Sequence, residues 1–135
     1  AIKAKVLKDV EFFERKPQVT KINAITKLFE QGKIKPDELY WFHDLDSFQL
    51  EPITASEIKI KNNEIALTDF GGAKRFGGDD RWHTGSIFFK SRSEDINEGI
   101  KRICYESKCD EEEALGLLIQ KDPLVRSRVK KISIT

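Results

Sequence analysis

Apolar runs that suit buried strands alternate with amphipathic helical patterns along most of this chain. The expected helices cover residues 18–31, 93–107 and 110–120, and the expected strands cover 38–44, 64–68, 84–90 and 129–135. Alternation of this kind is typical of an α/β domain, in which helices pack on a mainly parallel or mixed sheet. Because 135 residues suffice for one core, residues 1–135 are expected to form a single domain.

Composition and targeting features narrow the class of protein. There are 24 Lys and Arg residues against 23 Asp and Glu residues, so the net charge of +1 gives no bulk attraction to nucleic acid or to an anionic membrane. No apolar run approaches the roughly 20 residues of a membrane span, and the first residues carry no secretory leader pattern. Cys104 and Cys109 are too few for a structural zinc site and are expected to be reduced thiols. The sequence therefore predicts a cytoplasmic protein with no nucleic-acid partner and no membrane span.

The strongest chemical signal is a pair of aspartates, Asp44 and Asp46, at the end of the apolar run that begins near residue 38. In open α/β sheets, ligands bind outside the carboxyl ends of the strands, so both carboxylates are expected to face one site. Carboxylate oxygens are hard ligands that suit Mg²⁺ or Mn²⁺, and such an ion would in turn hold the oxygens of a diphosphate. We therefore predict a divalent metal site at Asp44 and Asp46. The alternative interpretation is that one aspartate caps a turn and the other is solvated.

Two families that share an aspartate pair of this kind agree poorly with the rest of the chain. The haloacid-dehalogenase-type phosphatases carry a small hydroxyl residue two positions after the second aspartate, where this chain has Phe48. The translesion-type DNA polymerases carry the spelling seen at 44–48, but the spacing of their second acidic motif is one residue shorter than that of 107–111. This chain also lacks the excess of basic residues that is typical of a template-binding protein.

Further motifs follow the chain in order around the aspartate pair. They are a Thr-Lys pair at Thr20–Lys21, a Thr-Gly-Ser corner at Thr84–Ser86 and an acidic helix start at Asp110–Leu115. Over about residues 18–120, this order resembles the central part of a GT-A-type nucleotide-sugar glycosyltransferase, in the group of glycogenin-like and small phage or bacterial transferases. The resemblance implies a three-layer α/β fold with a mainly parallel mixed sheet. It also implies transfer of a sugar from a nucleotide-diphosphate donor to a hydroxyl acceptor, with Mn²⁺ or Mg²⁺ as cofactor.

The glycine-rich loop and the strand after it supply the candidate donor-binding residues. In the resembling family, the corner formed here by Thr84, Gly85 and Ser86 approaches the donor sugar or the acceptor, and glycine permits close backbone contact. Trp82 is suited to stack on the C–H face of a sugar, and Arg81 to meet the phosphates once the loop closes. The alternatives are an ordinary strand start with a bulge, a tryptophan packed beneath the loop and a solvated arginine.

Two acidic residues are candidates for catalysis. Asp69 ends an expected strand and so points to the same carboxyl edge, where it suits a sugar-binding residue or a base towards an acceptor hydroxyl. Glu111, at the start of a helix, is placed to orient the acceptor, with helix capping as the alternative. His43 is expected to face away from Asp44, either as a buried residue or as a residue that supports a metal ligand without touching the ion. His83 is a candidate ligand or acid–base group.

Parts of the resembling family's pattern have no match here. Residues 1–17 show no strand and loop that would hold the nucleotide base, and the chain stops at Thr135, before the place of a third metal ligand. The sequence also has no Met. We therefore expect either a fragment of a longer reading frame or a reduced member of the family, which would bind donor weakly and transfer sugar poorly. The competing functions are a phosphohydrolase of the haloacid-dehalogenase type and a non-catalytic truncated domain.

Overall fold

A four-stranded mixed sheet forms the centre of the computed structural model, which describes residues 7–14, 16–44, 55–69 and 82–132. The strands are β1 (Tyr40–His43), β2 (Ile65–Asp69), β3 (Trp82–Phe89) and β4 (Val129–Lys131), in the order β1-β3-β2-β4. β3 runs antiparallel to both β1 and β2, whereas β2 and β4 are parallel. Three described strands therefore point in one direction and β3 points in the other. The α/β class with a mixed sheet is confirmed, although most neighbouring pairs are antiparallel.

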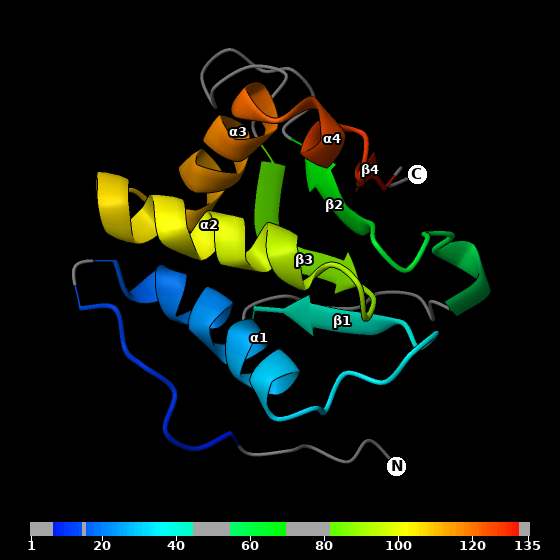
Figure 1. Ribbon diagram of the computed structural model, residues 1–135, viewed down its shortest axis with the longest axis horizontal. Helices are drawn as coiled ribbons and strands as arrows, with labels where there is room; N and C mark the ends of the chain where they lie inside the picture. Colours follow the sequence, from blue (N-terminus) through cyan, green and yellow to red (C-terminus); the bar gives the residue numbers. More distant parts are fainter. Residues whose placement is uncertain (1–6, 15, 45–54, 70–81, 133–135) are drawn as a thin grey trace.

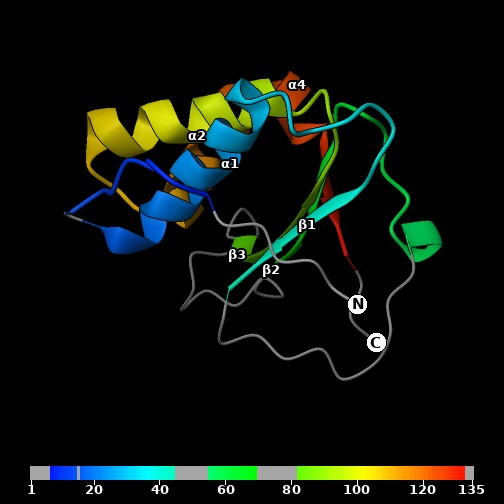
Figure 2. The ribbon, with the colours of Figure 1, turned by 90° about the horizontal axis from the view of Figure 1, so that it is seen from below.

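The four α-helices lie together on one face of this sheet. The helical segments are η1 (Pro17–Val19), α1 (Thr20–Glu30), η2 (Ala55–Glu57), α2 (Glu94–Ser107), α3 (Glu111–Lys121) and α4 (Pro123–Arg126). The four α-helices share one hydrophobic core with the sheet (Figure 1), and Figure 2 shows them on one side of the strands. In the described part of the chain the other face carries no α-helix, so the third layer that the resemblance implies is not seen there. Within the same residues, no helix has both the length and the apolar character needed to cross a membrane.

The main core lies between the helical layer and the sheet because each helix carries one apolar stripe. α1 buries Ile22 and Ile25, and α2 buries Ile96, Ile100 and Ile103, all at the three- and four-residue spacing of a helix face. Full burial of such a side chain is worth about 1.5–3 kcal/mol relative to exposure. A smaller cluster on the outer face of the sheet contains Ile60, Ala66 and Phe88. The larger hydrophobic core therefore lies on the face of the sheet that the helices cover.

β3 changes its register with β2 near the middle of the strand. Ala66 pairs with Phe88, and regular pairing from that point would place Thr68 opposite Ser86. Thr68 instead pairs with His83, so β3 contains extra residues that have no regular partner on β2. Such an irregularity bends a strand and redirects its side chains.

On the N-terminal side of the irregularity, the side chains of β3 lie on the faces opposite to those that regular alternation would give them. Ile87 belongs to the helix-side core, whereas Ser86 lies on the outer face. Strict alternation would therefore put Thr84 on the outer face, because a strand has a period of two. Thr84 instead donates from its hydroxyl to Glu111 of α3, and Trp82 packs against the helix-side core. The register shift thus turns the Thr84 side chain towards the helices, while Ser86 stays on the outer face.

Arg128, just before β4, ties the end of the described chain to α2 and to the turn before β2. Its Nη1 and Nη2 donate to the two carboxylate oxygens of Asp95, both at 2.6 Å. Its Nε donates to the carbonyl of Asn63 at 2.7 Å, and Nη2 also donates to the carbonyl of Arg92 at 3.2 Å. The hydrogen bonds from Arg128 hold the pKa of Asp95 below its usual value. A planar guanidinium suits this bidentate arrangement.

The two cysteines, Cys104 and Cys109, are buried free thiols. Burial raises the pKa of Cys104 to about 12 and also raises the pKa of Cys109. Both side chains are therefore protonated at neutral pH and act as small core residues.

Candidate functional site

Lys21 is the centre of a polar cluster at the carboxyl end of β1. It lies in the first turn of α1, four residues before the buried Ile25, and only 9% of its side chain is exposed. Its Nζ is 3.0 Å from Asp44 Oδ1 and 3.2 Å from Glu111 Oε1. It also donates to Asp44 Oδ2 at 3.3 Å and to the carbonyl oxygen of Thr84 at 3.4 Å. One ammonium group therefore joins α1, β3, the residue after β1 and the start of α3.

Glu111 is turned into the protein instead of capping its own helix. The residue that caps α3 is Asp110, whose side chain accepts a hydrogen bond from the backbone N–H of Glu113 at 2.8 Å. The Glu111 side chain is 4% exposed, and its Oε1 accepts from the hydroxyl of Thr84 at 2.9 Å. Its Oε2 is buried without a hydrogen-bond partner in the described part of the chain. The capping interpretation of Glu111 is therefore wrong.

Gly85 leaves room for the His83 ring and the Asp44 carboxylate. Its carbonyl accepts from the backbone N–H of Asp44 at 2.8 Å, and its own N–H donates to His83 Nδ1 at 3.0 Å. A Cβ atom on Gly85 would lie 2.6 Å from His83 Cε1 and 3.2 Å from Asp44 Oδ2. Any side chain at this position would have to displace the His83 ring. The close approach of this glycine to a sugar stays a prediction.

Trp82 and Ser86 take different positions around this corner. Trp82 packs against the helix-side core, and its indole Nε1 is buried with no hydrogen-bond partner among the described residues. Ser86 lies on the outer face, where its hydroxyl accepts from Trp41 Nε1 at 2.6 Å. Trp41 in turn stacks on Phe88 with an interplanar angle of 7°. The structure thus brings Trp82 to the same side as Thr84 and separates Ser86 from the cluster.

Of three other predicted site residues, the structure describes the backbone of one and leaves two outside the described ranges. Asp69 is the last residue of β2, which runs in the same direction as β1, so its backbone stands at the same sheet edge as Asp44. Asp46 and Arg81 lie outside the described residues. The expected loop over residues 70–81 lies outside them as well.

Of the two interpretations of His43, the buried one is wrong, because the residue is exposed. β1 is an edge strand of the described sheet, and its outer face has no helix over it in the described ranges. The ring of His43 is exposed there, with its centroid 4.7 Å from that of Trp41. Its Nδ1 lies 3.0 Å from the carbonyl oxygen of Asp44. His43 therefore touches the backbone of the aspartate and not its carboxylate.

Asp44 has the chemistry of a divalent-metal ligand, but its carboxylate already contacts a cation. The side chain is 36% exposed, and carboxylate oxygens suit Mg²⁺ or Mn²⁺. Both oxygens, however, contact Lys21. Within the described residues no group of three or more His, Cys, Asp or Glu is arranged to hold an ion. These residues fit a divalent ion through Asp44 alone, with most of the coordination shell left to other donors.

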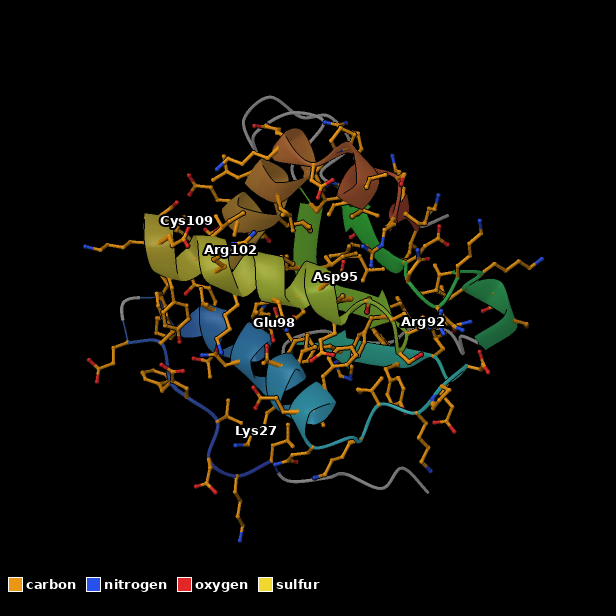
Figure 3. The ribbon with its side chains drawn as sticks, in the orientation of Figure 1. Lys27, Arg92, Asp95, Glu98, Arg102 and Cys109 are labelled. Atoms are coloured by element: carbon orange, nitrogen blue, oxygen red, sulfur yellow. The ribbon has the colours of Figure 1, made fainter. Side chains whose placement is uncertain are left out.

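Of two hollows in the described part of the protein, one touches this cluster and the other is lined by none of its residues. A cavity of about 20 Å³ in the apolar core touches the cluster through Thr84, and it has room for roughly one water. An open groove of about 710 Å³ follows α2, where Arg92, Asp95, Glu98 and Arg102 line its wall (Figure 3). Neither hollow is lined by Asp44, so a ligand of Asp44 would approach from the solvent side of that residue.

Lys21 is the member of the cluster to which the sequence patterns assigned no role. A signal for it exists, because Lys21 precedes Ile25 by four residues and Phe29 by eight, on the apolar stripe of α1. A lysine on the buried face of a helix needs a carboxylate partner, since burial of an unpaired charge is costly. Asp44 was the carboxylate already predicted at a strand end.

Comparisons of the chain with protein-family models, with curated proteins and with solved structures found no match.

Proposed function

We propose that this chain is a metal-dependent glycosyltransferase domain of the GT-A type, which moves a sugar from a nucleotide-diphosphate donor to a hydroxyl acceptor. The observation that carries the proposal is the meeting of four segments that are far apart in the sequence. The ammonium group of Lys21 contacts Asp44, Thr84 and Glu111 at distances of 3.0–3.4 Å. Each belongs to one of the motifs on which the resemblance rests. An isolated aspartate pair on a loop would require no such neighbours.

The charges of the cluster suit a diphosphate leaving group. Cleavage of a glycosyl–phosphate bond leaves negative charge on the diphosphate, and bound Mn²⁺ or Mg²⁺ supplies positive charge that neutralises it. Asp44 would hold this ion, with Asp46 as the second carboxylate. Lys21 keeps a further positive charge at the same edge of the sheet, where a fixed charge can stabilise the leaving group without reorganising.

The remaining candidate residues extend the same site. The buried Trp82 Nε1 and Glu111 Oε2 are a donor and an acceptor without partners in the described residues, and we assign both to hydroxyl groups of the sugar or the acceptor. We assign Asp69, at the same sheet edge as Asp44, to the acceptor hydroxyl as a base. Arg81 is assigned to the phosphates. These roles together describe donor and acceptor meeting at the carboxyl ends of β1 and β2.

Calorimetric binding of nucleoside diphosphates tests the proposal. UDP, GDP, CDP, ADP and dTDP are each titrated into the protein with Mn²⁺ and with EDTA. We expect one of them to bind only with Mn²⁺, and Asp44→Asn to weaken this binding by about tenfold or more, as expected for a lost charged contact. Glu98→Gln is the matched control, because Glu98 is an exposed carboxylate on α2 (Figure 3). Unchanged binding in Asp44→Asn, or no Mn²⁺-dependent binding of any nucleotide, would overturn the proposal.

The phosphohydrolase alternative has less support from the geometry. In that reaction the first aspartate would attack phosphorus as a nucleophile. Lys21 contacts both carboxylate oxygens of Asp44, which stabilises the negative charge that a nucleophile must use. Turnover of an aryl phosphate with Mg²⁺, lost in Asp44→Asn, would favour the phosphohydrolase. Absence of both this turnover and nucleotide binding would favour a non-catalytic domain.

A further inference from the structure

The ion pairs of Lys21 differ strongly in their exposure to solvent. The side chains of Lys21 and Glu111 are 9% and 4% exposed, whereas that of Asp44 is 36% exposed. The contact between Lys21 and Glu111 is therefore an internal feature, and Thr84 adds a hydroxyl on the same Glu111 oxygen. The contact between Lys21 and Asp44 is open to solvent on one side. Exposed pairs are weakly held, while buried pairs break only at considerable cost.

We propose that Lys21 is an internal competitor for the metal, so that the ammonium group and a divalent cation bind the Asp44 carboxylate alternately. This inference rests on the proposed metal role of Asp44. Both oxygens of Asp44 contact Lys21 Nζ, at 3.0 and 3.3 Å, so neither is free of a cation. Two like charges that share one carboxylate repel each other, so the second cation binds more weakly while the first remains.

The cluster also provides a place for the ammonium group when Asp44 is released. Nζ contacts Glu111 Oε1 at 3.2 Å and the carbonyl of Thr84 at 3.4 Å, and neither contact involves Asp44. Glu111 is anchored by α3 and by the Thr84 hydroxyl, so it stays in position. Lys21 can therefore leave Asp44 without becoming a buried charge that lacks a partner. Glu111 is the positioning residue that makes the exchange possible.

Titration of Mn²⁺ alone, without nucleotide, tests this competition directly. We expect Lys21→Met to bind Mn²⁺ about tenfold more tightly, since a positive charge close to the metal position is removed in a partly exposed site. Glu111→Gln should bind Mn²⁺ more weakly than wild type, because Lys21 then has Asp44 as its remaining carboxylate partner among the described residues. Lys27→Met is the matched control, because Lys27 lies on the same helix and makes none of these contacts (Figure 3). Its Mn²⁺ affinity should equal that of wild type.

A double variant keeps the test decisive if Lys21→Met does not fold. Lys21→Met with Glu111→Gln removes the ammonium group and its buried partner together, and the amide retains an acceptor for Thr84. Circular dichroism establishes that each variant is folded. The double variant should still bind Mn²⁺ more tightly than wild type, although the gain is smaller than in Lys21→Met.

Mn²⁺ affinities that differ from these expectations overturn the inference. They can be distinguished from a failure of the proposed glycosyltransferase function. Equal or weaker Mn²⁺ affinity in the folded Lys21 variants means that Lys21 does not compete. If Mn²⁺-dependent nucleotide binding by wild type persists in that case, the glycosyltransferase proposal stands. If neither wild type nor the Lys21 variants bind Mn²⁺ with or without nucleotide, both the competition and the metal role of Asp44 are wrong.

Discussion

Removal of the Lys21 ammonium group should destabilise the protein strongly, because the Lys21 side chain is only 9% exposed and pairs with a buried carboxylate. Lys21→Met leaves Glu111 with a 4% exposed carboxylate and, among the residues that the structure describes, only the Thr84 hydroxyl as a partner. Removing one member of a buried ion pair costs about 3–5 kcal/mol, because the other charge stays buried. Loss of the exposed ion pair between Lys21 and Asp44 adds about 0–1 kcal/mol to this cost. Since domains are stable by only about 5–15 kcal/mol, the variant should lose a large share of its stability.

A double-mutant cycle measured by urea unfolding separates this pair from its surroundings. The set contains wild type, Lys21→Met, Glu111→Gln and the double variant. Glu111→Gln should cost less than Lys21→Met, because Lys21 keeps Asp44 and the Thr84 carbonyl. The double variant should be more stable than the two single losses predict, with a coupling of about 1.5–3 kcal/mol. Lys27→Met should stay within about 0.5 kcal/mol of wild type, as a surface substitution does.

Two results would refute this reasoning. A loss below about 1 kcal/mol in Lys21→Met would mean that Glu111 is not an internal charge that depends on Lys21. Additive losses within about 0.5 kcal/mol would mean that the two groups do not interact at the observed 3.2 Å.

Three further predictions concern other parts of the fold. Arg128 lowers the pKa of Asp95, so the stability from this pair should be present above the unfolded-state pKa of about 3.9 and be lost as pH falls through the lower folded-state pKa. Urea unfolding at falling pH should show a smaller loss in Asp95→Asn, and equal acid sensitivity would contradict the pairing. Gly85→Ala should cost about 1–3 kcal/mol, because the new Cβ lies 2.6 Å from His83, and a neutral result would show that this ring moves aside freely. Cys104, with a pKa of about 12, should resist Ellman's reagent in the native state and react once unfolded, whereas rapid native labelling would mean that the thiol is accessible.

The helices and strands could be predicted because each depends on a local period. The spacing of Ile96, Ile100 and Ile103 indicates one buried helix face without knowledge of what covers it. The direction of β3 could not be predicted in the same way. An apolar run fits either direction, and the choice depends on which strands pair across long sequence separations. The register shift in β3 could not be predicted either, because it also depends on pairing between distant segments.

The candidate site could be predicted where one local rule decides the outcome. The position of Asp44 follows from an apolar strand that ends in a carboxylate. The room that Gly85 leaves for the His83 ring has no such local signal. The role of Glu111 depends on how α3 packs on β3, because a glutamate in the first turn of a helix equally suits the helix dipole. The exposure of His43 depends on which strand forms an edge of the described sheet. Both depend on contacts between distant segments.

The register shift in β3 transfers the Thr84 backbone from β2 to the start of α3. Ile87 and Phe89 belong to the hydrophobic core, and Trp82 and His83 pair again with β2 beyond the shift. Between them, the N–H of Thr84 bonds to the side chain of Glu112 at 3.3 Å instead of to a neighbouring strand. The irregularity affects only the pairing with β2, because β3 stays paired with β1 as far as the bond between the Asp44 N–H and the Gly85 carbonyl. The cluster is therefore coupled to the start of α3, and a displacement of α3 would reach Thr84 through Glu111 and Glu112.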